Sequence, residues 1–415
     1  MYVLHQMTQK KQHGLTLLEL LIAMLIGTLL ILGATSMFIA NKRVYKEVDY
    51  QGRLAENARF GMEMMIRDLR MVGFMGCSVQ QEVINNLNLG ATNPERELLS
   101  YLTKNSSDCN ADITSTTCIQ ANSIEGAEVD ASGNVNWQPS QSTEPTDANL
   151  TLVAGTDAFS VRFFEDTQTN LCKDMISADS VLEVNNQGST PIAAGTFIEG
   201  AVFAASDCEA TNIFQLTADA TTPGSGASAT EAGTGPFELA HASGSLTPGN
   251  SVSTLSKIYI SGTVCAASPV DIFIFRARRY FVATDTNVQN GLPALYRQTF
   301  EFNAANAAAT TPEVFSERLI DGVENMQILY GEDTSGNRVA NAYRVAGAVV
   351  NWANVVSVKL AVLFATVEQD FTAPEDTKSD YQLLDATAFD PTTGANDHRR
   401  RKIVEATVAL RNRQL

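Results

Sequence analysis

A long apolar run close to the amino terminus limits what this chain can fold into more than any other feature. The run covers residues 15–40, with the sequence LTLLELLIAMLIGTLLILGATSMFIA, and Glu19 is its one charged residue. An α-helix of roughly 20 apolar residues crosses a bilayer, so this run is long enough to span one. A secretory signal peptide has a shorter apolar core, with a small-residue cleavage site behind it. The run therefore predicts a membrane-spanning helix.

The residues around the start of the run indicate a second use for this segment. Lys10 and Lys11 precede Gly14, and Glu19 is the fifth residue after that glycine. A carboxylate in a membrane helix costs ~2–3 kcal/mol, which favours a functional reason for keeping it. Cleavage after Gly14 would leave the helix in place and give Leu15 a free α-amino group. That amine would lie one helical turn from position 19, where Glu19 of a neighbouring subunit could pair with it.

The string GLTLLE at residues 14–19 resembles the class III leader of type IV prepilins. Such a leader has a basic segment, a glycine, an apolar residue and a glutamate as the fifth mature residue. The resemblance implies that residues 1–14 are removed by prepilin peptidase after Gly14. It also implies N-methylation of Leu15, which stands where the family usually has phenylalanine. The alternative is an ordinary membrane anchor in which Glu19 has no function.

The helical pattern continues beyond the apolar run. Apolar residues recur every three or four positions, which is typical of an amphipathic helix: Val44, Val48, Ala55, Ala58, Met62, Met65, Leu69 and Val72. Glycines that follow Val72 favour a helix end. We predict one helix from about Leu15 to Phe74, with a transmembrane half at 15–40 and an amphipathic periplasmic half at 41–76.

The rest of the chain, residues 77–415, has the pattern of a β-rich head. Short alternating apolar runs predict half-buried strands at 159–164, 257–260, 271–282, 325–330, 356–364 and 404–410. Stretches rich in small polar residues predict loop insertions near 103–150 and 217–256. The predicted fold class is therefore α+β and pilin-like, with a long N-terminal membrane-spanning helix packed on an enlarged antiparallel β-rich periplasmic head.

Six cysteines follow the apolar run: Cys77, Cys109, Cys118, Cys172, Cys208 and Cys265. An even number beyond a membrane anchor favours disulfides formed in an oxidising periplasm. None of them forms a CxxC pair of the zinc or thioredoxin type. Buried free thiols are the alternative, and the sequence does not choose among the possible pairings.

Composition and motifs argue against several functions. The formal charge is −17, from 29 basic and 46 acidic residues, and such a chain repels the phosphates of nucleic acids. It contains no P-loop, dinucleotide-binding or nucleophile-elbow string, and its four histidines are scattered. We therefore predict no catalytic, cofactor-binding or metal-binding residues, no cofactor and no enzymatic activity. Residues 333–337 fit a hairpin turn better than a calcium loop.

One basic cluster, HRRRK at residues 398–402, has two main interpretations. Charges that flank an edge strand block unwanted strand pairing. Alternatively, the cluster contacts an acidic patch on a partner pilin. DNA binding is a weaker third interpretation because the whole chain is acidic.

Several strings in the head resemble the PilW group of minor pilins. They are RDLRMVGFMGC at 67–77, ASDCEATNIFQLT at 205–217, GVENMQILYGEDTSGNRVANAY at 322–343, NVVSVKLAVLF at 354–364 and VEATVALRNR at 404–413. The resemblance implies a subunit that joins other minor pilins in a complex that primes type IV pilus assembly. The implied partners are the other minor pilins, the major pilin, a PilY-type tip adhesin, prepilin peptidase and the inner membrane. The implied location is the inner membrane before assembly, as a single-pass protein, and the pilus tip afterwards.

Two other functions fit the leader and the anchor. A GspJ-type minor pseudopilin of type II secretion shares the leader and the priming role, and loss of secretion rather than loss of pili on deletion would identify it. A membrane-anchored protein that binds a surface through its head would function without processing at Gly14.

Overall fold

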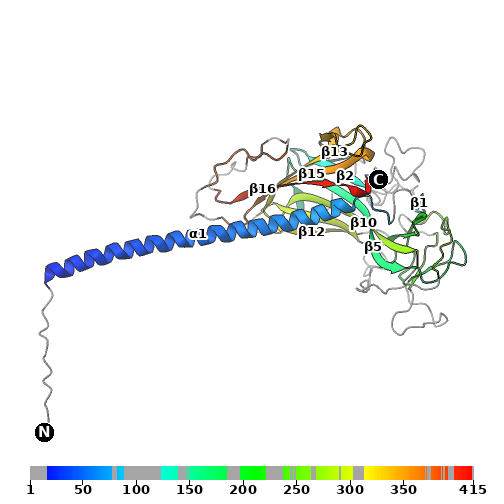
Figure 1. Cartoon of the computed structure of the whole chain (residues 1–415), viewed down its shortest axis with the longest axis horizontal. Helices are drawn as coiled ribbons and strands as arrows, with labels where there is room; N and C mark the ends of the chain where they lie inside the picture. Colours follow the sequence, from blue (N-terminus) through cyan, green and yellow to red (C-terminus); the bar gives the residue numbers. More distant parts are fainter. Residues whose placement is uncertain are drawn as a thin grey trace, which may run out of the picture.

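The computed structural model describes a long helix and a β-rich head. It describes residues 16–76, 82–87, 123–138, 147, 149–184, 197–220, 237–243, 246, 249–262, 268–288, 291–301, 313–369, 371, 375–384, 386, 388–390 and 397–413. The helix projects far beyond the head at its amino-terminal end, while its carboxy-terminal half lies along the sheets (Figure 1). This is the predicted α+β arrangement of a pilin-like fold.

Helix α1 extends from Leu17 to Met71, close to the predicted bounds. The Thr16 hydroxyl caps its start by accepting a hydrogen bond from the Glu19 N–H at 3.2 Å, as N-cap threonines do. The helix ends at Met71, and Gly73 follows with a φ of +74°, a conformation that favours glycine.

Only the second half of the amphipathic stripe is buried. Val44, Val48 and Ala55 are exposed, and burial begins at Leu54, one position from the predicted stripe. The buried face then follows helical spacing through Ala58, Gly61, Met62, Met65, Asp68 and Leu69. This face packs against the head, so the head covers a shorter part of the helix than the apolar pattern indicates.

The larger sheet has ten described strands. A path of hydrogen-bonded neighbours runs β1-β8-β7-β10-β5-β2-β3, β4 and β11 pair with β10, and β12 pairs with β11. Every pairing is antiparallel except β1 with β8. The strands are β1 Glu82–Asn85, β2 Ile124–Val129, β3 Val135–Gln138, β4 Leu150–Leu152, β5 Asp157–Asn170, β7 Val202–Ser206, β8 Ala210–Gln215, β10 Asp271–Asp285, β11 Ala294–Glu301 and β12 Glu313–Asp321.

A second sheet of four strands, in the order β14-β13-β15-β16, lies beside the helix. Its strands are β13 Val323–Glu332, β14 Ala342–Arg344, β15 Val355–Ala365 and β16 Arg401–Ala409. Two short strands, β6 Leu182–Val184 and β9 Phe237–Leu239, form a separate pair. Three 3-10 turns complete the described elements: η4 Ala346–Ala348, η5 Trp352–Asn354 and η7 Arg411–Arg413.

The main core lies where the helix meets both sheets. Helix residues Met65 and Leu69 pack there with Tyr280 of β10 and with Leu360 and Phe364 of β15. A second core, which includes Phe203, Phe214 and Tyr259, fills the part of the head around β7, β8 and β10. Three smaller clusters lie elsewhere in the described part of the head, and α1 contributes to the main core.

The structure corrects three predictions about the head. The stretch 103–150 is not all loop, because it contains β2, β3 and the start of β4, and 217–256 contains β9. Residues 257–260 belong to no strand: the Tyr259 carbonyl accepts a bond from the Met175 N–H, and no continuous ladder forms. Strand β15 is buried on both faces rather than half-buried, with Lys359 as its one partly exposed residue.

Candidate assembly surface

The amino-terminal half of α1 is a fully exposed apolar rod. It is long and apolar enough to cross a membrane, and none of its most apolar stretch is buried in the structure. Glu19 lies in the first turn of the helix and is exposed. Gly14 and Leu15, the predicted processing residues, lie outside the described residues. An apolar surface of this length requires lipid or other apolar helices as its surroundings.

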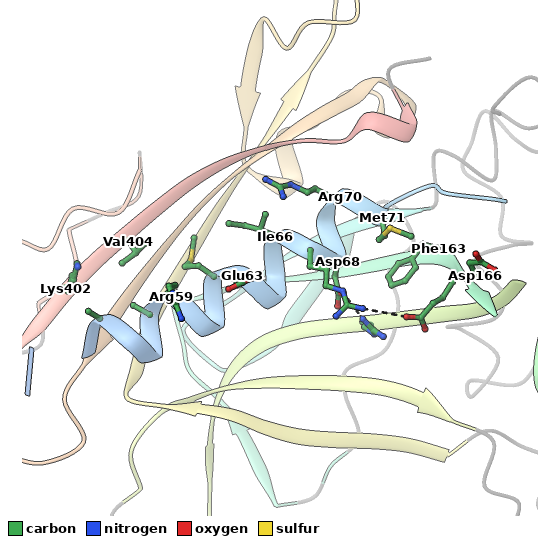
Figure 2. A pocket seen from close by; sticks show the side chains of 16 residues that line it. Arg59, Glu63, Ile66, Asp68, Arg70, Met71, Phe163, Asp166, Lys402 and Val404 are labelled. Atoms are coloured by element: carbon green, nitrogen blue, oxygen red, sulfur yellow. Dashed lines mark hydrogen bonds and ion pairs between the residues drawn. The ribbon is translucent and has the colours of Figure 1, made fainter. Parts of the chain in front are cut away.

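A groove of about 940 Å³ follows the other half of the helix, where α1 lies between β16 on one side and β5 and β10 on the other (Figure 2). Its floor is largely apolar, and charged side chains stand along it. The lining residues from α1 are Ala55, Ala58, Arg59, Met62, Glu63, Ile66, Arg67, Asp68, Arg70 and Met71, and the head supplies Phe163, Glu165, Asp166, Arg278, Lys402 and Val404.

A buried carboxylate anchors the helix to the larger sheet. Asp68 accepts hydrogen bonds from Arg278 Nη1 at 2.6 Å and from the Tyr280 hydroxyl at 2.5 Å. Asp68 is 2% exposed, so both bonds form in a poorly solvated site where they are strong. Burial, reinforced by the Asp68 charge, raises the pKa of Tyr280 well above its usual range. The tyrosine therefore stays a hydrogen-bond donor at physiological pH.

A second ionic cluster joins β16 to the rest of the smaller sheet. Arg401, 1% exposed at its side chain, binds both carboxylate oxygens of Glu324, at 2.6 and 2.9 Å. It also binds Asp376 at 2.7 Å and Asp397. Burial alone would raise the pKa of Asp376, but hydrogen bonds from Arg401, Tyr381 and the Lys378 N–H outweigh it and hold that pKa below the usual range. One guanidinium thus holds three carboxylates from separate segments.

These contacts decide how the basic cluster at 398–402 is used. Arg399 pairs with Asp397 at 3.3 Å, Arg400 with Glu47 of α1 at 3.0 Å, and Arg401 with its three carboxylates. The three arginines are therefore committed to ion pairs within the chain. The cluster does flank an edge strand, β16, and its last member Lys402 forms no ion pair with the described residues, so both main interpretations stay predictions for that side chain.

Two of the six cysteines lie among the described residues. Cys172 and Cys208 are each disulfide-bonded, and no described cysteine is free. Cys77, Cys109, Cys118 and Cys265 lie outside the described residues, so the pairing stays open.

The described residues bring no set of three or more metal-ligating side chains together. The loop at Asp333 is a hairpin turn between β13 and β14, as predicted. The Asp333 carboxylate accepts bonds from the N–H groups of Ser335, Gly336 and Arg338, at 2.6 to 2.9 Å. These amides saturate the carboxylate within its own turn, a common use of aspartate in loops.

Sequence reasoning missed both ionic anchors. A charged residue on the buried face of a helix breaks the apolar pattern, and the RDLRM string that contains Asp68 indicates the family but not a buried ion pair. Arg401 stands among neighbouring arginines, and no local pattern distinguishes the buried arginine from the others. Its three partners are distant in sequence or lie before the strand.

Comparison with known proteins gives two family matches. Residues 9–35 match the prokaryotic N-terminal methylation motif, which includes Gly14, Leu15 and Glu19. Residues 279–412 match the PilW family, type IV pilus-assembly protein W, from the second half of β10 to the turn after β16. The strings at 67–77 and 205–217 lie outside that match. No curated protein and no solved structure matches the chain.

Proposed function

With both family signatures in one chain, this protein is a PilW-type minor pilin of the type IV pilus, and we propose that it is processed by prepilin peptidase and helps to initiate pilus assembly. In this proposal it acts in a complex with other minor pilins near the pilus tip, and its partners include the major pilin and a PilY-type adhesin. Membership of the family indicates a structural protein that contacts other pilus components. We further propose that it acts near the pilus tip and at the start of assembly.

The observation that carries the proposal is the division of α1 into two halves. The first half is apolar and unburied, and the second is fixed to the head by Asp68 and an apolar face. Such a helix holds the chain in the inner membrane before assembly and can exchange lipid for neighbouring pilin helices afterwards. The head then projects on the periplasmic side, where disulfides at Cys172 and Cys208 can form.

The proposed domain organisation follows from this division. Residues 1–14 are the removed leader, 15–40 the transmembrane half of the helix, 41–76 its periplasmic half, and 77–415 the head. Removal of the leader deletes Lys10 and Lys11 and no acidic residue, so the formal charge changes from −17 to −17 − 2 = −19.

Substitution at the cleavage boundary tests the proposal. A bulky side chain in Gly14→Val should block the peptidase, so mass spectrometry should detect only the precursor, and pili that depend on this subunit should be lost. Gly52→Val is the matched control, because nothing lies within 4 Å of that glycine and it lies outside the apolar run and remote from the cut. Mature-length Gly14→Val protein would contradict the leader assignment. Measuring pili and protein secretion in the same strain separates this function from a type II secretion pseudopilin.

A further inference from the structure

Strand β16 leaves one edge of the smaller sheet open beside the groove along α1. We propose that this edge receives an extended segment of a partner protein as an added β-strand. In the partner segment, the side chains that face the groove are mostly apolar, and one of them is acidic. The proposal rests on the proposed function only in taking the chain to be anchored in the same membrane as other copies of itself.

The hydrogen-bond register of β16 defines the open edge. Strand β15 bonds to residues with even numbers, as shown by Leu410 N–H to Val356 O and Thr366 N–H to Arg400 O, both at 2.9 Å. In an antiparallel pair, bonded and non-bonded positions alternate, so the N–H and C=O groups of odd-numbered residues point away from β15. Ile403, Glu405 and Thr407 present these groups, which have no partner among the described residues.

Two of the usual obstacles to strand addition, proline and a bulge, are absent from this edge, and its exposed charges within the strand are Lys402 and Glu405. Proteins protect open edges with proline, bulges or charged side chains. Strand β16 contains no proline, and its pairing with β15 has no register shift. The arginines that precede it are committed to internal ion pairs, as described above. Its β-branched residues Ile403, Val404, Thr407 and Val408 favour a sheet.

The groove determines which side chains the added strand should carry. Even-numbered side chains of β16 face α1, and Lys402 and Val404 line the groove with Met62 and Arg59. An added strand continues this face, so alternate side chains enter the groove. Among the groove side chains, the cations Arg59, Arg70 and Lys402 and the acids Glu63 and Asp166 form no ion pair with the described residues. Lys402 is the one that belongs to β16 itself, so it lies beside the added strand. Unpaired cations on an apolar floor favour a partner strand with apolar residues and a carboxylate.

A second copy of this chain fits the edge poorly. Strand β16 runs in the same direction as α1, because Arg400 before the strand contacts Glu47, and Asn412 after it contacts the Arg70 and Val72 carbonyls. Figure 1 shows the two elements side by side. Antiparallel pairing of two β16 edges would therefore point the two apolar helices in opposite directions. Copies anchored in one membrane cannot pair in this antiparallel way, and we commit to a different protein; parallel pairing of two copies is the competing outcome that the experiment below separates.

Hydrogen exchange on the full chain in detergent micelles tests the proposal. The probe is a seven-residue peptide that alternates valine with threonine and carries one glutamate among the valines. At saturating peptide, exchange of the outward amides of Ile403, Glu405 and Thr407 should slow about tenfold or more, while the amides bonded to β15 change little. A peptide with lysine in place of the glutamate should protect them less. Absence of protection at millimolar glutamate peptide would overturn the proposal.

Two variants locate the bound peptide. Thr407→Pro removes an outward N–H that β15 does not use, so the fold should persist and protection should be lost, whereas Thr407→Val should keep both. Lys402→Glu should reverse the preference between the two peptides.

Protection that survives unchanged in Thr407→Pro would place the peptide elsewhere and refute the proposal. Protection that rises with the concentration of the protein alone would identify a second copy instead. Gly14→Val should still bind the peptide, so failure at this edge is distinguishable from failure of the processing proposal.

Discussion

Asp68 is the residue on which attachment of the helix to the larger sheet most depends. Removing it leaves Arg278 and Tyr280 without their buried partner, and breaking a buried ion pair costs about 3–5 kcal/mol. We expect Asp68→Ala to lower the free energy of unfolding of the head by about 3 kcal/mol. Urea titration of the full chain in micelles can measure this by fluorescence, because Trp137 and Trp352 are both buried in the head.

Glu63→Ala is the matched control for this prediction. Glu63 lies on the same helix and lines the same groove, yet it is exposed and takes part in no described ion pair. Exposed surface substitutions usually change stability by less than about 0.5 kcal/mol. Equal effects of the two substitutions would show that the Asp68 contacts do not hold the helix.

Asp157 should make the stability of the head depend on pH. Burial raises its pKa to about 7, the Ile328 N–H bond opposes this shift, and the charge of Glu128 adds to it. The folded state then binds a proton more tightly than the unfolded chain, in which aspartate titrates near 3.9. Protonated Asp157 contributes fully to the free energy of unfolding below about pH 4. This contribution is lost as the pH rises to about 7, which lowers the free energy of unfolding by up to about 4 kcal/mol.

Substituting Asp157→Asn should remove this dependence while the side-chain oxygen still accepts the Ile328 N–H. The difference in unfolding free energy between variant and wild type should therefore grow in favour of the variant from pH 4 to pH 7. Asp166→Asn, at a carboxylate exposed in the groove, is the control. A wild type and variant with parallel pH profiles would rule out a raised pKa at Asp157.

At the scale of elements, Arg401 holds three segments together: β13 through Glu324, the extended segment at Asp376, and the start of β16 through Asp397. Arg401→Leu would leave three carboxylates close together without a cation, so we expect a loss of about 3–5 kcal/mol. Hydrogen exchange should increase selectively in residues 375–409. Lys402→Ala, at the neighbouring exposed residue, should leave exchange unchanged, and similar exchange in both variants would refute the role of Arg401.

The elements were predictable where local pattern decides them. Helix α1 was predicted within a few residues because its apolar run and its stripe are both local signals. Strand β16 alternates as predicted because one of its faces meets solvent. Strand β15 has the same alternating pattern, but Tyr381 and Leu383, which follow it in the chain, cover its second face. Residues 257–260 have strand-like composition, but no strand in the described part of the chain pairs with them. Pairing and covering partners are properties of the tertiary structure.

The candidate assembly surface also has one part that the sequence predicts, the leader motif, and one part that it does not, the groove. The leader motif needs only the order of residues around Gly14 and Glu19, so the sequence predicts it, and the methylation-motif match covers it. The groove beside α1 combines side chains from the helix with Phe163, Arg278 and Lys402, far along the chain. Its position depends on how the two sheets close on the helix, which no local pattern specifies.

For the whole molecule, Glu19 should act in assembly rather than in membrane insertion. The apolar run alone holds the segment in a bilayer, so Glu19→Ala should insert normally and be processed at Gly14. Docking should fail, because the α-amino group of a neighbouring subunit loses its partner, and an unpaired buried ammonium costs several kcal/mol. Glu19→Gln should be nearly as harmful, since it keeps the shape and loses the charge.

Glu56→Ala, at an exposed acid of the same helix outside the apolar run, should assemble normally. Surface pilus yield and cross-linking to other minor pilins are the measurements. Native pili and native cross-links with Glu19→Ala would mean that the helix docks through its apolar surface alone.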